Sequence, residues 1–326
     1  MRRGSFNLTS YSKLGLFLVA LVFGVNLASP ADSKGQRVKT SRADSTVAAL
    51  KVDADLVEIP VTVVDKADRI IDNLSKENFS VYENGVEQTV AHFGLYEGPI
   101  SACLVFDSSG SMERKLQKSI EAVKELLDAA IPDDEYCLVR FNEWAETIVG
   151  ITDDSARIAR ALNRIHPGGW TALLDAISLG MEQVKRGHNN RKAIVLISDG
   201  GDNRSQRTQQ DIKRLVREAD AQIYSIGIVS ADDQTLYPVT IDGPTLMKTI
   251  SGQSGGRLFL IHKVDELPSV IAKITMALRH QYLLGYYPGD ARNDGKYRRV
   301  TVKVNPPRGT PAMRVYWRSG YYAPIE

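Results

Sequence analysis

The strongest constraint on the fold is an alternation of strand and helix patterns through the middle of the chain. Short apolar runs, such as ISACLVF at 100–106 and AIVLI at 193–197, predict strands that are buried on both faces. Between these runs, apolar residues recur at helical spacing, as at Leu116, Ile120 and Val123. Strands that alternate with helices predict an α/β fold with a doubly wound, mostly parallel sheet, covered by helices on both faces.

The segments on either side of this region have strand patterns instead. Apolar residues alternate with polar ones near Val57–Val63, and Asn84-Gly85 favours a tight hairpin turn. After Arg279 the chain returns to strands, and neither flank has enough of them for a stable sheet alone. We therefore expect the flanks to pair into one small β-sandwich, with the α/β domain inserted between its halves. The predicted divisions are a signal peptide at 1–30, a linker at 31–52, sandwich halves at 53–98 and 282–326, and the α/β domain at 99–281.

The N-terminus has the pattern of an export signal. Arg2, Arg3 and Lys13 precede an apolar run at 14–25, which is too short to span a bilayer comfortably. We expect an exported protein, periplasmic or secreted, with no stable membrane span after cleavage of the signal. An uncleaved signal that acts as an anchor is the alternative.

Composition excludes several classes of function. The chain has 41 basic and 39 acidic residues, so its net charge of +2 gives no electrostatic reason to expect nucleic acid as a partner. Its two cysteines are too few for a disulfide-based scaffold or a cysteine-based zinc site.

Polar residues gather at the predicted ends of two strands and at the start of a helix. Ligands of open parallel sheets bind beyond the carboxyl ends of the strands, where these loops would meet. The loops are DSSGS at 107–111, PGGWT at 167–171 and SDGGD at 198–202. Together they offer two carboxylates and three hydroxyls, from Asp107, Ser109, Ser111, Thr171 and Asp199.

This oxygen set predicts a site for a hard divalent cation. Mg²⁺ suits it best, because that ion takes octahedral oxygen ligands at about 2.0–2.1 Å and keeps some of its waters. Mn²⁺ or Ca²⁺ could replace it. The alternative interpretation is helix N-capping by Asp107, Ser109, Ser111 and Thr171, with a plain turn at Asp199.

The same residues carry a resemblance to a known family. D-x-S-x-S at 107–111, the later Thr171 and S-D-G at 198–200 resemble the metal-ion-dependent adhesion site (MIDAS) of von Willebrand factor A (VWA) domains and integrin I domains. The resemblance covers about residues 99–281. The flanking segments resemble an exported bacterial VWA-related family of acidobacterial type; they are LSKENFSVYENG, YLLGYYP, RRVTVKV and SGYYAP.

The resemblance implies a metal-dependent protein-binding module for adhesion or assembly, and not an enzyme. Ser109 and Ser111, joined by Thr171 in an open state, would bind the ion directly, and Asp107 and Asp199 would act directly or through water. One coordination position would remain for an Asp or Glu carboxylate of a protein partner. A cation held mainly by neutral hydroxyls keeps positive charge that attracts such a carboxylate.

Three further residues are candidates for the rim that meets the partner. Trp170 precedes the predicted threonine ligand, Asp202 follows the S-D-G loop, and Asn142 follows a strand. Trp170 and Asp202 also have plainer interpretations, as a partly buried loop aromatic and as a solvated loop residue.

Other consequences of the resemblance concern the cysteines and the last helix. Cys103 and Cys137 would lie in neighbouring strands, where we expect two buried thiols, although export permits a disulfide. In the related integrin domains the last helix shifts when the metal site changes, and the helix at 266–278 could be coupled in the same way.

Two alternative functions remain at this point. One is a structural envelope or assembly protein whose metal only stabilises the fold. The other is an α/β hydrolase or phosphotransferase, but the chain lacks the G-x-x-x-x-G-K-[ST] and G-x-G-x-x-G motifs. The sequence does not determine the oligomeric state.

Overall fold

The structure is a computed structural model that describes residues 56–229, 242–290, 292–307, 309–310 and 312–325. The predicted signal peptide and linker lie outside these residues. The strands are β1 Val57–Val64, β2 Phe79–Glu83, β3 Val86–Gln88, β4 Val90–Tyr96, β5 Ile100–Asp107, β6 Glu135–Phe141, β7 Ala145–Thr152, β8 Arg191–Ser198, β9 Gln222–Ile228, β10 Leu258–Ile261, β11 Gln281–Tyr286, β12 Tyr297–Val304, β13 Arg314–Trp317 and β14 Gly320–Tyr322. The α-helices are α1 Leu116–Asp128, α2 Ser155–Leu162, α3 Leu173–Val184, α4 Gln209–Glu218, α5 Gly243–Ser254 and α6 Leu267–Arg279.

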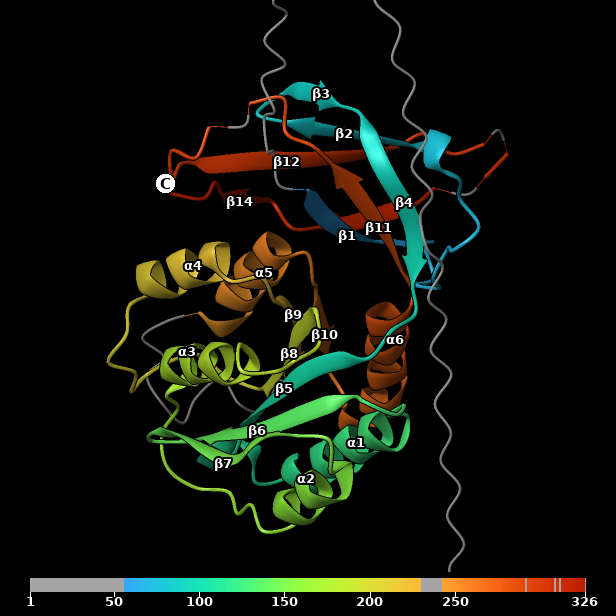
Figure 1. The fold of residues 1–326 in the computed structure, drawn as a ribbon. Coiled ribbons are helices and arrows are strands. Elements are labelled where there is room, and N and C mark those ends of the chain that lie inside the picture. Colours follow the sequence, from blue (N-terminus) through green and yellow to red (C-terminus); the bar gives the residue numbers. More distant parts are fainter. Residues whose placement is uncertain (1–55, 230–241, 291, 308, 311, 326) are drawn as a thin grey trace, which may run out of the picture. The chain divides into compact units, whose positions relative to one another are not determined.

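A six-stranded sheet forms the centre of the α/β domain, in the order β10-β9-β8-β5-β6-β7. All neighbouring strands are parallel except β6 and β7, which form an antiparallel pair. Every residue of β5 is buried, as its uninterrupted apolar run predicts. Parallel strands of this kind need helices on both faces, and Figure 1 shows the helices in two groups around the sheet.

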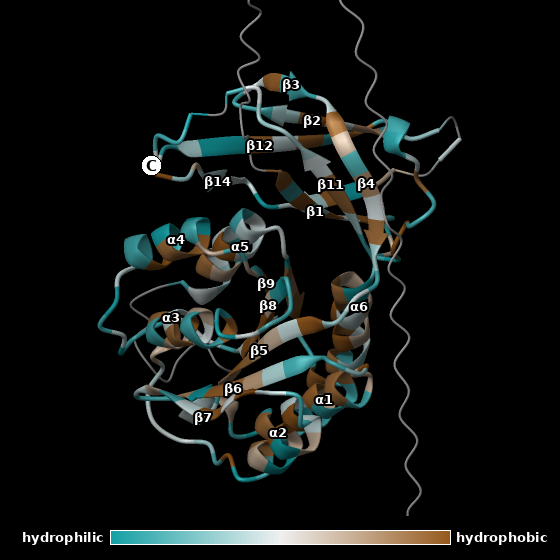
Figure 2. Ribbon diagram, in the orientation of Figure 1, coloured by the Kyte–Doolittle hydropathy of each residue, from teal (hydrophilic) through white to brown (hydrophobic). Residues whose placement is uncertain are grey.

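Two apolar cores separate the sheet from these helix groups. One core joins the sheet to α1, α2 and α6, and the other joins it to α3, α4 and α5. Figure 2 shows β5 as largely hydrophobic, whereas the outer side of α4 is hydrophilic. The apolar strands, which are buried on both faces, and the amphipathic helices therefore account for the layers.

The flanking strands form a β-sandwich of two antiparallel sheets. Their orders are β13-β1-β11-β4 and β14-β12-β2-β3, so each sheet combines strands from before and after the α/β domain (Figure 1). Side chains from both sheets share one apolar core. The predicted fold class, an α/β domain inserted into a small β-sandwich, is confirmed.

The insertion point lies where the chain leaves β4 and returns in β11. These two strands pair antiparallel, with Tyr96 opposite Gln281. The buried carboxylate of Asp134 accepts hydrogen bonds from the amide of Ile100 (2.9 Å) and from Arg279 (3.0 and 2.5 Å). It therefore fixes both segments that connect the α/β domain to the sandwich, the one from β4 to β5 and the one from α6 to β11. Burial pushes the pKa of Asp134 upward, but these hydrogen bonds outweigh it and lower the pKa below 3.8.

The expectation of two buried thiols is wrong. Cys103 and Cys137 form a disulfide, with their Cα atoms 4.6 Å apart. The two residues lie directly opposite each other in the parallel register of β5 and β6, so the side chains leave the same face of the sheet side by side. This separation is within the range that a disulfide accepts.

Most predicted elements occur within a few residues of their expected positions, with two differences. β14 is a strand that the sequence did not predict, and residues 86–93 contain two strands, β3 and the start of β4. None of the helices in the described ranges is long and apolar enough to cross a membrane.

Candidate functional site

The candidate metal site begins where β5 and β8 end side by side. The parallel register that pairs Phe106 with Ile197 brings Asp107 next to Ser198. Ser198 Oγ donates a hydrogen bond to Asp107 Oδ2 at 2.5 Å, and the amide of Ser109 donates to Asp107 Oδ1 at 2.8 Å. The carboxylate of Asp107 is fully buried, and it therefore serves as the floor of the site.

Two serine hydroxyls connect this floor to the loop after β8. Ser109 Oγ and Ser111 Oγ are 3.2 Å apart, and Ser111 Oγ donates to Asp199 Oδ1 at 2.8 Å. The alternating D-x-S-x-S spacing thus places both hydroxyls on one side of the turn, facing the second carboxylate. Four of the five predicted ligands are joined by these contacts.

Lys115 adds a positive charge that the sequence analysis did not identify. Its Nζ lies 2.5 Å from Asp199 Oδ2, and the two side chains are 7% and 0% exposed. Lys115 is the residue directly before α1, and its position four residues after Ser111 is the signal that could have revealed it. The site contains its own ammonium group as well as its two carboxylates.

The loop that carries Thr171 is tied to the loop after β5 through its backbone. The amide of Gly110 donates to Gly169 O at 3.0 Å, and the amide of Gly168 donates to Ser108 O at 2.8 Å. Gly169 has φ +83°, a left-handed conformation that a glycine adopts without strain.

Asn203 fixes the end of this loop. Its Oδ1 accepts from the amide of Thr171 at 2.8 Å, and its own amide donates to Thr171 O at 3.1 Å. The hydroxyl of Thr171 makes no hydrogen bond in the described part of the chain, so it remains available to a ligand. All five predicted ligands therefore belong to loops that are hydrogen-bonded to one another.

The helix-capping alternative is not supported by the geometry. The cap of α1 is Lys115 and the cap of α3 is Ala172, and neither makes a side-chain capping hydrogen bond. Ser109 caps a short 3-10 turn, also without a side-chain hydrogen bond. The hydroxyls of this cluster face each other instead of the helix amides.

The predicted rim residues lie in different surroundings. Trp170 is 41% exposed beside the site, and Trp144, which the sequence analysis missed, is 57% exposed. Asp202 is buried: its carboxylate accepts from the amide of Leu174 at 3.0 Å and from the hydroxyl of Ser205 at 2.5 Å. A role of Asp202 toward a partner therefore stays a prediction, whereas its contact with the start of α3 is structural.

Asn142 links two of the loops. Its carbonyl oxygen accepts from the amide of Ala172 at 2.7 Å, while its side-chain Oδ1 is buried without a hydrogen-bond partner. A buried acceptor without a partner is costly to the folded state.

The donor set fits a hard divalent cation. Within the described ranges no group of three or more His, Cys, Asp or Glu side chains could hold a metal, so a site here depends on hydroxyl oxygens. Burial and the neighbouring carboxylate of Asp199 raise the pKa of Asp107 to about 7. Two carboxylates brought together in this way favour a cation between them.

Comparisons with known proteins agree with this geometry. The family model "von Willebrand factor type A domain" matches residues 103–203. A protein from Synechocystis sp. is 31% identical over 113 residues, which is 32% of this chain and 27% of that protein. Inter-alpha-trypsin inhibitor heavy chain H2 of Mus musculus is 31% identical over 147 residues, 40% of this chain and 15% of its own length. The chain thus covers well under two thirds of either relative.

Two solved structures are similar to this chain at low identity. A von Willebrand factor type A protein from Catenulispora acidiphila is 13% identical, with 84% of this chain and 74% of that chain covered and a TM-score of 0.48. Proximal thread matrix protein 1 from the mussel byssus, with a zinc-occupied MIDAS motif, is 19% identical, with coverage of 60% and 50% and a TM-score of 0.49. Residues 103–203, which carry all three loops of the site, therefore match the von Willebrand factor type A domain family.

Proposed function

We propose that this chain is a metal-dependent protein-binding module that works outside the cytoplasm. The observation that carries the proposal is the hydrogen-bonded run from Ser109 through Ser111 to Asp199, with Asp107 beneath it and Thr171 on the adjoining loop. In this proposal these five residues hold Mg²⁺, with Mn²⁺ or Ca²⁺ as substitutes. A protein partner completes the coordination with an Asp or Glu carboxylate.

The charges of the site support this role. With both carboxylates ionised and Lys115 protonated, the residues carry one net negative charge. A divalent ion changes this to one net positive charge in a largely buried place, where Coulomb interactions are strong. An anionic group from outside is therefore attracted, and a carboxylate offers charge-assisted contacts.

The surroundings of the site suggest where a partner would touch. Trp170 and Trp144 present large exposed aromatic surfaces, and tryptophan is common among residues that dominate binding energy. In the proposal they form a rim around the ion. Asn142 lies below this rim and orients the loop.

The disulfide supports the proposed location. Disulfides persist in oxidising compartments such as the periplasm and the outside of the cell. Together with the N-terminal signal pattern, the Cys103–Cys137 bond favours an exported protein. The proposed divisions of the chain remain those at residues 30, 52, 98 and 281.

A hydrolase is the less favoured function. The hydroxyls of Ser109 and Ser111 contact each other and Asp199, and no histidine hydrogen-bonds to either of them in the described ranges. Activation of a serine nucleophile needs such a base.

A pull-down from the native cell envelope tests the proposal. The bait is the full chain, with Mg²⁺ or with chelator, as wild type, as Ser109→Ala and as the control Ser108→Ala. Ser108 is also buried, but its hydroxyl bonds to Phe141 O and not to the site. We expect the same protein to be captured by wild type and Ser108→Ala only with Mg²⁺. Capture that persists with chelator would refute the proposal, and Mg²⁺ that raises stability without affecting capture would favour a purely structural metal.

A further inference from the structure

A groove lies between helices α4 and α5 of the α/β domain and strands β12 and β13 of the sandwich. Its volume is about 560 Å³, which is within the usual range of ~300–1,000 Å³ for ligand sites. The described residues that line it include two arginines and three aromatic residues but no carboxylate; the five are Arg217, Arg299, Tyr297, Tyr316 and Trp317. The groove is thus positively charged and has flat aromatic walls.

Backbone contacts hold the two walls of the groove together. The amide of Ser319 donates to Gln253 O of α5 at 3.0 Å. Gly256, which also lines the groove, lies against the second residue of β9, so that a Cβ on it would be 2.0 Å from Ile223 O. The groove is therefore at the amino end of β9. The metal loops follow the carboxyl ends of the strands parallel to β9, so the two sites are at opposite ends of the sheet.

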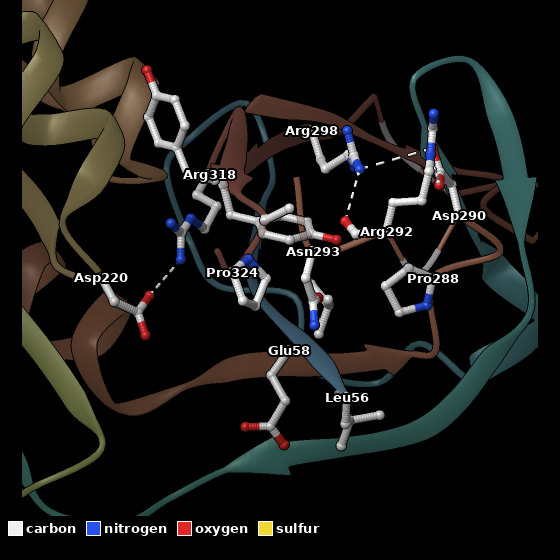
Figure 3. Close-up of a pocket in the computed structure, with 14 residues that line it drawn as sticks. Leu56, Glu58, Asp220, Pro288, Asp290, Arg292, Asn293, Arg298, Arg318 and Pro324 are labelled. Carbon is white, nitrogen blue, oxygen red and sulfur yellow. Dashed lines mark hydrogen bonds and ion pairs between the residues drawn. The ribbon is translucent and has the colours of Figure 1, made fainter. Parts of the chain in front are cut away.

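The two arginines of the groove have no carboxylate partner. Neither Arg217 nor Arg299 forms an ion pair in the described part of the chain, and Arg299 is exposed while Arg217 is half-buried. Nε of Arg217 donates to Lys213 O at 3.2 Å, and this contact does not use its two Nη groups. Arg318 differs, because it pairs with Asp220 at 2.7 Å, as the dashed line in Figure 3 shows. Two positive charges are therefore available to an anion.

Tyr297 lies close to both of these charges. It is two residues from Arg299 on β12, so the two side chains leave the same face of the strand. Burial raises the pKa of Tyr297, and the positive charges of Arg318, Arg217 and Arg299 oppose this rise. Arginines from the α/β domain and from the sandwich thus come together beside one aromatic ring.

Gly252 leaves one wall of the groove open. It is exposed in the last turn of α5, where glycine is less favourable to a helix than alanine. A Cβ at this position would meet no atom within 4 Å, so packing does not require a glycine here. A longer side chain at Gly252 would instead extend into the groove that this residue lines.

We propose that this groove binds a segment of an acidic polysaccharide, whose carboxylates pair with Arg217 and Arg299. The paired N–H donors of a guanidinium match the two oxygens of a carboxylate. The two full charges exceed the partial charge of about −0.5 at the carboxyl end of α5.

The aromatic walls favour a polysaccharide over an acidic peptide. Tyr297, Tyr316 and Trp317 offer flat apolar faces on which the C–H groups of a sugar ring can pack. The hydroxyls of both tyrosines make no hydrogen bond in the described ranges, and such groups can donate to and accept from sugar hydroxyls. The exposed Arg299 leaves the groove open to solvent, as a polymer that continues beyond the site requires.

Titration calorimetry with oligogalacturonate in the presence of chelator tests this proposal on the full chain. The chelator removes divalent ions, so a carboxylate cannot bind through the metal site and the result does not depend on the proposed function. The methyl ester of the same oligosaccharide keeps its shape without its charge, and poly-glutamate keeps the charge without sugar rings. Wild type is compared with Arg217→Gln, Arg299→Gln and Gly252→Gln. Arg157→Gln is the control, because Arg157 is an exposed arginine of α2 without an ion pair in the described part of the chain.

We expect saturable binding of oligogalacturonate to wild type and to Arg157→Gln. Each arginine variant of the groove should bind about tenfold more weakly or worse, because it loses charge-assisted hydrogen bonds. Gly252→Gln should also bind more weakly, while its melting temperature stays at or above that of wild type, because glutamine is the better helix former. These opposite effects separate obstruction of the groove from damage to the fold.

Several results would overturn the proposal. They are no saturable binding of oligogalacturonate, equal binding of the acid and its methyl ester, or unchanged affinity in the arginine variants or in Gly252→Gln. Tighter binding of poly-glutamate would assign the groove to an acidic peptide and would also refute it. If an arginine variant does not fold, the comparison of the acid with its methyl ester on wild type still decides.

Discussion

The buried pair of Lys115 and Asp199 leads to a sharp prediction for Lys115→Met. Two unit charges 2.5 Å apart attract by roughly 7 kcal/mol at an effective dielectric constant of about 20. Desolvation offsets part of this attraction, and removal of one partner from a buried pair costs about 3–5 kcal/mol. Because Asp199 is 0% exposed, it cannot recover this loss from water. We expect Lys115→Met to lower the free energy of unfolding by that amount in the presence of chelator.

A divalent ion should reverse much of this loss. Mg²⁺ supplies the counter-charge that the variant lacks, and it no longer competes with an ammonium for Asp199. We therefore expect Mg²⁺ to stabilise Lys115→Met more than it stabilises wild type, and to bind the variant more tightly. Urea unfolding with chelator and with saturating Mg²⁺ measures the stabilities, and calorimetry measures the affinity.

Lys118→Met is the matched control for this experiment. Lys118 lies on the same helix and pairs with Asp265 at 3.2 Å, but both side chains are more than half exposed, at 55% and 76%. Exposed pairs contribute little, so we expect a change within about 1 kcal/mol that does not depend on Mg²⁺. The reasoning is refuted if Lys115→Met loses the same stability with and without Mg²⁺, or if Mg²⁺ stabilises wild type more than the variant.

Three further predictions follow from the described contacts. The double variant Cys103→Ala/Cys137→Ala should lose roughly 4 kcal/mol of unfolding free energy, since the bond closes a loop across a sequence separation of 34 residues; urea unfolding without reductant measures this, and equal stabilities would contradict it. The pKa of Asp134 is lower in the folded state than the ordinary 3.8, so the stabilisation by its carboxylate is present above that pH and is lost as the pH falls toward the folded-state value. The free energy of unfolding should therefore fall less steeply with pH below about pH 4 in Asp134→Asn than in wild type, and parallel plots of this free energy against pH would argue against it. Gly169→Ala should cost about 1–2 kcal/mol and weaken Mg²⁺ binding, because φ is +83° and the new Cβ would meet Glu143 Cγ at 2.8 Å, whereas Gly200→Ala, with nothing within 4 Å, should change stability little; thermal melts and calorimetry compare the two, and equal effects would exclude the strain argument.

The sequence was sufficient for the architecture because the pattern is local. Buried strands such as β5 read as unbroken apolar runs, and parallel strands end at one edge, so the loops after Asp107 and Ser198 had to meet. The sandwich followed from a count of strands, because neither flank could form a sheet alone. These inferences need no knowledge of side-chain contacts.

Features that depend on register and on burial could not be predicted in this way. The disulfide needs Cys103 to lie directly opposite Cys137, and a shift by one residue would have placed the two side chains on opposite faces. The Lys115–Asp199 pair joins residues 84 positions apart. The sequence alone indicated that Asp202 is a carboxylate of an exposed loop, but it is buried and accepts hydrogen bonds from the amide of Leu174 and the hydroxyl of Ser205.

Anomalous diffraction from crystals grown with Mn²⁺ tests the central claim most directly. The claim is that oxygens from three loops hold a divalent cation and leave one coordination position open. We predict a Mn²⁺ peak at bonding distance from the hydroxyls of Ser109 and Ser111, with a water or a foreign carboxylate in the remaining position. The absence of a Mn²⁺ peak at this place would contradict the account, as would an ion whose coordination positions are all filled by side chains of this protein.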